Sequence, residues 1–284
     1  MNINDQLKPF MEPRSVALVG VSRRTGKEAF NTLENLLGCG YQGHIYPVNP
    51  GVVEIQGVET FPSIEAIQGD VDLAVIATPR EAVIPLVNQC VEKGIRCIIV
   101  VAQGFADADE QGKKLQRELV VVARSGGARV IGPNTFGSAN AFAGFSSAFF
   151  PLEMERIPVG LICQTGVFLA GFPGLKLVGK AFDLGNACDV DFSEALEYFE
   201  NDPQVSLVVA HLEGVSDGGR FLEVAGRVSG KKPVLVWKTG RTEKGARVAQ
   251  SHTGSITGKD EVWRAALSRA GVVRVSELDE LRDT

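Results

Sequence analysis

Short apolar runs alternate with amphipathic segments along the first half of the chain. The runs have the length of buried strands, and the segments between them have helical spacing. This alternation predicts a parallel, doubly wound sheet, a Rossmann-like α/β domain whose ligand-binding loops gather at the carboxyl ends of its strands. We expect strands at residues 16–19, 44–48, 73–77, 97–101 and 129–131, and helices near 27–37, 81–93 and 108–124.

The periodicity lapses between residues 139 and 158 and then begins again. Small residues, phenylalanines and prolines fill this stretch. Two α/β domains in series are therefore predicted, 1–145 and 146–284, the second also built on a parallel sheet. In the second we expect strands at residues 159–163, 181–184, 205–212, 234–237 and 272–275, and helices near 167–177, 193–200, 219–228 and 259–269.

Composition narrows the class of protein. Of 284 residues, 44% are hydrophobic and 32 are glycine, as in an α/β protein with many tight strand–helix turns. The net charge of −5 gives no reason to expect a nucleic acid or an anionic membrane as partner. No apolar stretch approaches ~18 residues, and the amino terminus lacks a basic, apolar leader, so we expect no membrane span and a cytoplasmic location.

The five cysteines never form a C-x-x-C pair and lie mostly in apolar runs. We interpret them as reduced packing residues, and we predict no metal site.

The segment of residues 20–27, Gly-Val-Ser-Arg-Arg-Thr-Gly-Lys, follows the first strand and opens a helix, as phosphate-binding loops do. A Walker A loop has four residues between its glycines and a Ser or Thr after the lysine. Here five residues intervene and Glu28 follows. An NAD site has G-x-G-x-x-G and a carboxylate at the end of the second strand. Here that strand ends in Asn49-Pro50, which disfavours NAD.

Coenzyme A is the third candidate ligand for this loop. Its adenosine carries a 3′-phosphate in addition to the pyrophosphate. Arg23, Arg24 and Lys27 supply three cations within five residues, which suits that additional charge. The alternative is a solvated basic turn in a fold that only resembles a nucleotide-binding one.

A second glycine-rich loop follows the expected strand at 234–237 and contains Ser251-His252-Thr253-Gly254-Ser255. A histidine in a polar, cationic loop at the carboxyl edge of a strand suits chemistry with an anionic group on or near the imidazole.

Eight short motifs occur in order along the chain, interleaved with the expected strands. With them the chain resembles the α-type portion of the NDP-forming acyl-CoA synthetases, the superfamily that includes succinyl-CoA synthetase and ADP-forming acetyl-CoA synthetase. The resemblance implies a Rossmann-like CoA-binding domain followed by a flavodoxin-like, succinyl-CoA-synthetase-type domain. The motifs are Val19-Gly20-Val21-Ser22, Tyr46-Pro47-Val48-Asn49-Pro50, Ala77-Thr78-Pro79, Ile131-Gly132-Pro133-Asn134, Gln164-Thr165-Gly166, Gly185-Asn186, Glu213-Gly214 and the Ser251–Ser255 segment.

The resemblance also implies a reaction, in which acyl-CoA, phosphate and NDP are converted reversibly to free acid, CoA and NTP. It places a transient phosphoryl group on His252, with Glu213 as the carboxylate that orients the imidazole. It assigns phosphate binding to Gln164, Thr165, Gly166 and Gly254. It assigns CoA binding to Gly20, Ser22, Arg23, Arg24, Gly26, Lys27, Asn49, Pro50, Thr78, Pro79, Gln103, Gly104 and Asn134.

Two further histidines, His44 and His211, are interpreted as structural, although His211 lies only two residues from Glu213 and could support it. The family's ATP-grasp half has no counterpart in the 284 residues. The nucleotide and its Mg²⁺ are therefore expected on a partner subunit or domain.

One departure from the family lies near the expected thiol and acyl end of CoA. Thr135 stands where many relatives have Cys, and bulky Phe136 follows it. With the phenylalanines at 142, 145, 149 and 150, this indicates either a different or larger acyl group or packing at the domain boundary. The main functional alternative is a regulatory module that senses CoA or acyl-CoA.

Overall fold

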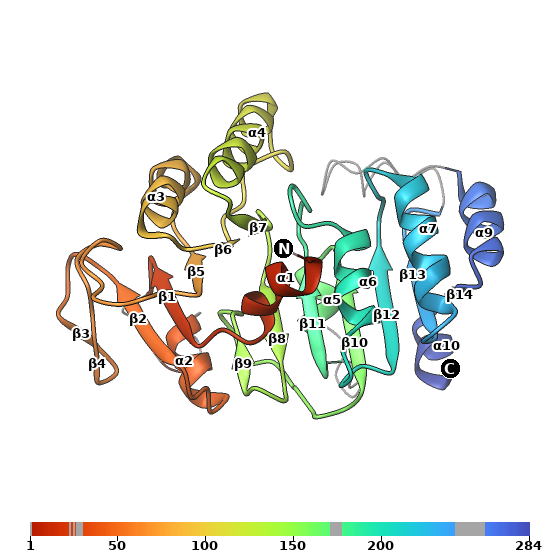
Figure 1. Cartoon of the computed structure of the whole chain (residues 1–284), viewed down its shortest axis with the longest axis horizontal. Coiled ribbons are helices and arrows are strands. Elements are labelled where there is room, and N and C mark those ends of the chain that lie inside the picture. Colours follow the sequence, from red (N-terminus) through yellow and green to blue (C-terminus); the bar gives the residue numbers. More distant parts are fainter. Residues whose placement is uncertain (1, 23, 25, 27–30, 171–177, 242–258) are drawn as a thin grey trace.

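The computed structural model describes residues 2–22, 24, 26, 31–170, 178–241 and 259–284. Their two large sheets lie side by side along the long axis (Figure 1). The first sheet is entirely parallel, in the order β2-β1-β5-β6-β7, and its strands confirm those expected in the first half. Its strands are β1 Ser15–Val19, β2 His44–Val48, β5 Leu73–Ile76, β6 Cys97–Val100 and β7 Arg129–Ile131.

The second sheet has seven strands in the order β14-β13-β12-β10-β11-β8-β9. Five of them are parallel and confirm the expected strands: β10 Val159–Cys163, β11 Lys180–Asp183, β12 Leu207–Leu212, β13 Val234–Lys238 and β14 Val273–Val275. The other two, β8 Gly137–Asn140 and β9 Phe145–Ser146, pair antiparallel at the edge beside β11. The sheet is therefore mixed: the five expected strands are parallel, and an antiparallel pair that was not predicted extends it at one edge.

Helices cover both faces of each sheet. Each expected helix has a counterpart, although the one at 167–177 lies within the described residues only as far as Ala170. A first helix, a last helix and a hairpin of two short strands (β3 Glu54–Ile55, β4 Val58–Glu59) were not predicted. The helices are α1 Ile3–Met11, α2 Thr32–Gly38, α3 Arg80–Lys93, α4 Glu110–Ser125, α5 Gly166–Ala170, α6 Phe192–Glu200, α7 Gly218–Ser229, α9 Asp260–Arg269 and α10 Leu278–Asp283.

Side-chain alternation along the strands builds the core on both faces of the first sheet. In β1, Val16 and Leu18 face the cluster that contains α1 and α2, whereas Ala17 and Val19 face the cluster beneath α3 and α4. The first of these clusters continues under α6 and α7 of the second sheet. Both halves of the chain therefore share one apolar core on this face.

Helix α1 carries that core across the junction between the two sheets (Figure 1). Its side chains Leu7, Phe10 and Met11 are fully buried, and the helix contacts both β6 and α6. Asn2 begins the helix by accepting a hydrogen bond from the backbone N–H of Asp5.

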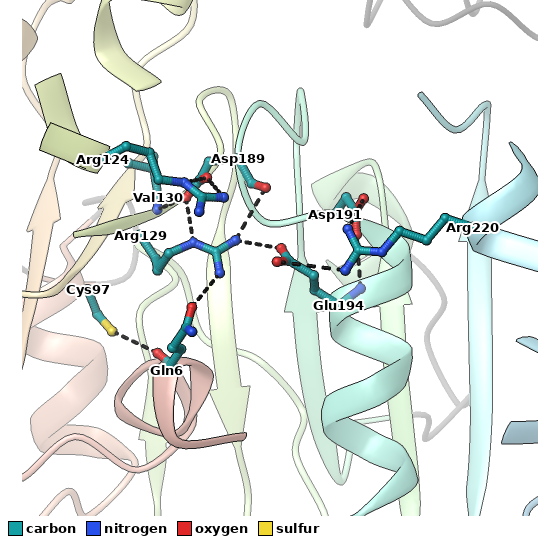
Figure 2. A network of polar contacts seen from close by, with 9 residues as sticks. All are labelled: Gln6, Cys97, Arg124, Arg129, Val130, Asp189, Asp191, Glu194 and Arg220. Atoms are coloured by element: carbon teal, nitrogen blue, oxygen red, sulfur yellow. Dashed lines mark hydrogen bonds and ion pairs between the residues drawn. The ribbon is translucent and has the colours of Figure 1, made fainter. Parts of the chain in front are cut away.

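A group of buried charges also joins the two halves, and Figure 2 shows it from close by. Arg129, in β7, donates Nε to the Asp189 carboxylate at 3.0 Å and Nη2 to Glu194, on α6, at 2.5 Å. Its Nη1 donates to Gln6 of α1 at 2.8 Å. The side chains of Arg129 and Asp189 are only 6% and 1% exposed. We call Arg129, Asp189, Glu194 and Gln6 the polar clamp.

Candidate functional site

The strand order of the first sheet reverses at β1. The chain adds β2 on one side of β1, and it then crosses over to add β5 on the other side. In doubly wound sheets, ligands bind at the carboxyl ends of the strands at such a point. A cavity of about 290 Å³ lies there. It is lined by Leu18, Val19, Gly20, Val21, Ser22, Thr32, Val75, Ala77 and Phe149. We call it the switch-point cavity.

Gly20 shapes the entrance of this cavity. It has a positive φ of 85°, and a Cβ there would lie 2.7 Å from both the Ala77 oxygen and the Thr78 Cγ2. Only glycine allows the loop to pass this close to the end of β5. The Thr78 hydroxyl beside it is buried and has no partner in the described part of the chain, so it is available to a ligand.

Asn31, which was not among the predicted site residues, holds the loop after Gly20 in place. Its Nδ2 donates to the carbonyl oxygens of Ser22 and Arg24, both at 3.0 Å. Its Oδ1 caps α2 by accepting from the N–H groups of Leu33 and Glu34. An Asn directly before an apolar helical run is a capping signal, and it would have pointed to this residue.

A carboxylate already binds part of the glycine loop. The Gly26 N–H donates to both oxygens of Glu34, at 3.2 and 3.0 Å. A backbone N–H that holds a carboxylate is a donor of the type that a phosphate also uses. Arg24 is exposed, and the expected cationic residues Arg23 and Lys27 lie outside the described residues.

Asn49 links the end of β2 to the same loop. Its Nδ2 donates to the Val21 carbonyl at 3.3 Å, and its Oδ1 accepts from the Gly51 N–H at 3.0 Å. Pro50 is exposed. Asn49 therefore fixes the loop through the backbone of Val21, with no carboxylate at the strand end.

The loops after β6 and β7 lie further along the same edge. Gly104, at a positive φ of 96°, donates its N–H to Asp107 and accepts from Arg80. Asn134, at φ 62°, donates its N–H to the Ala102 carbonyl at 2.9 Å. Expected residues Gln103 and Pro79 are exposed on this edge.

Asp183 anchors the segment that passes from β7 into β8. Its buried carboxylate accepts from the N–H groups of Phe136 at 2.7 Å and Gly185 at 3.3 Å. Burial raises the pKa of Asp183 to about 6. The hydroxyl of Thr135 donates to the carbonyl oxygen of the same residue.

The second sheet brings two of the expected motifs together. Gln164 follows β10, Glu213 follows β12, and these strands are parallel neighbours. The Gln164 side chain is 4% exposed, and its Oε1 accepts from the N–H groups of Glu213 at 3.0 Å and Gly214 at 3.3 Å. Gln164 thus fixes the backbone that presents Glu213, while α5 begins two residues later at Gly166.

Two other buried polar side chains lie at this edge. His211 is stacked on Phe168 with ring centroids 4.5 Å apart, and burial lowers its pKa to about 4. Its Nδ1 has no partner among the described residues, consistent with a neutral, structural imidazole. Burial likewise lowers the pKa of Lys238 to about 8, although Asp260 and Glu213 oppose this shift.

A cleft of about 500 Å³ opens beside Gln164 and Gly214, between the start of α4 and the starts of α6 and α7. It is lined by residues from both halves of the chain, including Gln116 and Asn186, which are hydrogen-bonded at 2.9 Å. Within the described ranges, no group of His, Cys, Asp and Glu side chains could hold a metal ion. Those ranges also contain no helix that is long and apolar enough to cross a membrane.

Comparisons with known proteins cover both halves. The family model described as a CoA binding domain matches residues 14–141, and the succinyl-CoA ligase like flavodoxin domain matches residues 157–284. The chain belongs to the NDP-forming acyl-CoA synthetase superfamily, as its α-type part.

Relatives of this superfamily align with nearly the whole chain. The chain is 38% identical, over 98% of its length, to the acetate–CoA ligase (ADP-forming) I subunit alpha of Pyrococcus furiosus and covers 62% of that protein. It is also 38% identical, over 98% of its length, to the acetate–CoA ligase (ADP-forming) II of Archaeoglobus fulgidus, of which it covers 42%.

A solved structure of an acetyl-coenzyme A synthetase 1 from Ca. Korarchaeum cryptofilum, in complex with phosphate and ADP, superposes with a TM-score of 0.88 at 34% identity. The match covers 97% of this chain and 60% of that one. The chain thus spans about two fifths to three fifths of these relatives.

The structure places several of the expected residues at two sheet edges. Gly20, Ser22, Asn49 and Thr78 gather around or beside the switch-point cavity of the CoA-binding domain. Gln164 and Glu213 meet at the edge of the flavodoxin-like domain. The remaining expected residues of the phosphoryl chemistry, His252 and Gly254, lie outside the described residues.

Proposed function

We propose that this chain is the CoA-binding and phosphohistidine-bearing part of an NDP-forming acyl-CoA synthetase. One observation carries the proposal: the Gln164 side chain holds the Glu213-Gly214 backbone, which unites two motifs separated by 49 residues at neighbouring strand ends. The switch-point cavity supports a CoA site on the first sheet, with a glycine at close approach and the unpartnered Thr78 hydroxyl. We assign the two functions to residues 1–145 and 146–284.

In the first step, an oxygen of phosphate attacks the thioester carbonyl carbon, the C–S bond breaks, and CoA leaves with the electron pair and a proton. The product is an acyl phosphate. The backbone N–H groups where α5 begins, with Gln164, Thr165, Gly166 and Gly254, are the residues to which we assign the phosphate. CoA itself is bound by the loop residues at the carboxyl ends of β1, β2, β5, β6 and β7.

In the second step, one ring nitrogen of His252 attacks the phosphorus, the acyl P–O bond breaks, and the free carboxylate leaves. Glu213 accepts the N–H of the other ring nitrogen, which fixes the tautomer and stabilises the charge on the ring. A covalent carrier divides a difficult transfer into two steps, because the phosphoryl group must travel from the CoA site to a nucleotide.

In the last step, an oxygen of NDP attacks the phosphorus and the N–P bond breaks. We assign the nucleotide, its Mg²⁺ and the ATP-grasp fold to a partner subunit or domain. The alpha-subunit name of the Pyrococcus furiosus relative and the partial coverage of the longer relatives support this division. We place the assembly in the cytoplasm.

Phosphoryl transfer to the chain tests the proposal. Incubation with acyl-CoA and radiolabelled phosphate is expected to give one acid-labile, base-stable label per chain. His252→Asn should abolish the label, and Glu213→Gln should slow its formation while leaving the CoA dissociation constant unchanged. Label that persists in His252→Asn would reject His252 as the carrier.

A further inference from the structure

Three phenylalanines form a compact cluster between the two proposed sites. The ring of Phe136 lies 5.0 Å from that of Phe149 and 4.7 Å from that of Phe150, and the last two are 5.5 Å apart. All three pairs meet edge to face, and each ring is only partly buried. We call these three residues the aromatic wall.

One end of the aromatic wall touches the place where α5 begins. A Cβ added to Gly166 would lie 2.1 Å from the ring of Phe136, so that ring rests directly on the Gly166 backbone. The hydrogen bond from the Phe136 N–H to the Asp183 carboxylate fixes the backbone that carries the ring. The position of Phe136 is therefore set from both sides.

The other end of the aromatic wall reaches the switch-point cavity. Phe149 lines this cavity together with Gly20 and Ser22 of the glycine loop. The two ends therefore connect the residues assigned to CoA with those assigned to phosphate.

The order of the groups in the reaction places the acyl group along this wall, provided that the proposed function holds. The acyl carbon is bonded to the sulfur at the tip of CoA, and an oxygen of the phosphate must reach this same carbon. A row of side chains that runs from the CoA cavity to Gly166 therefore lies beside the thioester and its acyl chain.

The chemistry of the wall determines which acyl chains it accepts. Its three side chains present only carbon and hydrogen, and none of the described residues that line the switch-point cavity is charged. An apolar acyl chain gains from burial against such rings. A second carboxylate would lose its hydration there without an ion-pair partner among these described lining residues, and the nearby Asp183 would repel it.

We propose that Phe136, Phe149 and Phe150 select the acyl group and that the substrate is an apolar acyl-CoA, in preference to a dicarboxylic one. The aromatic wall thus sets specificity rather than taking part in proton or phosphoryl transfer.

Butyryl-CoA and succinyl-CoA provide a matched pair of probes, because the acyl chains have the same number of carbons and end in a methyl group or a carboxylate. We measure kcat/KM for phosphate-dependent labelling of the chain with each. For the wild type, the ratio of butyryl to succinyl is expected to be at least about 100, from the cost of desolvating an unpaired carboxylate.

Three variants sharpen this measurement. Phe136→Ala opens the wall to water and should lower the ratio about tenfold, whereas Phe136→Leu keeps it apolar and should preserve the ratio. Phe142→Ala is the control, since Phe142 is also partly buried but lines a different cavity, with Arg14 and Tyr41. If circular dichroism shows that Phe136→Ala does not fold, Phe150→Ala provides the same comparison.

Failure of the inference and failure of the proposed function give different results. A wild-type ratio near one, or equal effects of Phe136→Ala and Phe142→Ala, overturns the aromatic wall as selector while the labelling itself stands. If neither acyl-CoA labels the wild-type chain, the proposed function fails. Calorimetry then decides the inference, which requires tighter binding of butyryl-CoA than of CoA and loss of that difference in Phe136→Ala; equal affinities overturn it.

Discussion

Two of the contacts that join the halves of this chain, the polar clamp and the aromatic wall, are built from opposite chemistry. In the polar clamp, each of the three nitrogens of the Arg129 guanidinium donates a hydrogen bond to a different side chain. The acceptors are Asp189, Glu194 and Gln6. The aromatic wall uses rings that are only partly buried and that contact one another edge to face. Directional, desolvated charges fix a geometry, whereas partly exposed rings leave apolar surface for a ligand.

The largest loss of stability is expected when Arg129 is removed from the polar clamp. Arg129→Met removes the buried cation that Asp189 and Glu194 share, and leaves them, among the described residues, only the more exposed Arg124 and Arg220 as ion-pair partners. The free energy of unfolding is expected to fall by up to about 3–5 kcal/mol. Urea denaturation measures the loss. The ratio of butyryl to succinyl labelling should stay at the wild-type value, since the clamp does not contact the aromatic wall.

The control for that variant is Arg14→Met, which breaks an ion pair with Asp72 in which the arginine side chain is 88% exposed. Its unfolding midpoint should stay close to that of the wild type, because water screens exposed pairs. Equal losses in the two variants would contradict the importance given to burial.

Gly166→Ala tests the contact between the aromatic wall and the start of α5. Gly166 begins α5 without a positive φ, so alanine fits the backbone but its Cβ collides with the Phe136 ring. Overpacking of this kind should cost about 1–3 kcal/mol in urea unfolding. The double variant with Phe136→Ala should recover most of this loss, and a purely additive pair would refute the contact.

His211 shows the cost of burying a titratable group among rings, with no partner for its Nδ1 among the described residues. Its pKa of about 4 in the folded chain is below the ordinary 6.5, so the unfolded chain binds the proton first as the pH falls. Stability is therefore lost from pH 6.5 downward, by about 2 kcal/mol between pH 6.5 and 5. Urea midpoints for the wild type should fall across this range more steeply than for His211→Leu; parallel curves would reject the shift.

Much of the fold could be predicted from the sequence because parallel strands buried on both faces give uninterrupted apolar runs, as in β5 and β6. Strand β8, Gly137–Asn140, gave no such signal, since it consists of small and polar residues that are nevertheless buried. Helix α1 was missed although Leu7, Phe10 and Met11 have helical spacing.

Those residues of the candidate site that belong to short sequence motifs could be predicted. Glycine 20 and Gln164 appear where a strand ends, and the structure places both at the carboxyl edges of their sheets. Arg129 was read only as the beginning of a strand, because its partner Asp189 lies 60 residues away. A long-range ion pair leaves no trace in local spacing.

Helix α1 has a consequence for how the molecule melts. Its apolar side chains belong to a single cluster that extends beneath both sheets, so neither half can lose its structure without exposing the interior of the other. Heating should therefore give one calorimetric transition for both halves, with equal van't Hoff and calorimetric enthalpies, where two independent modules would give two.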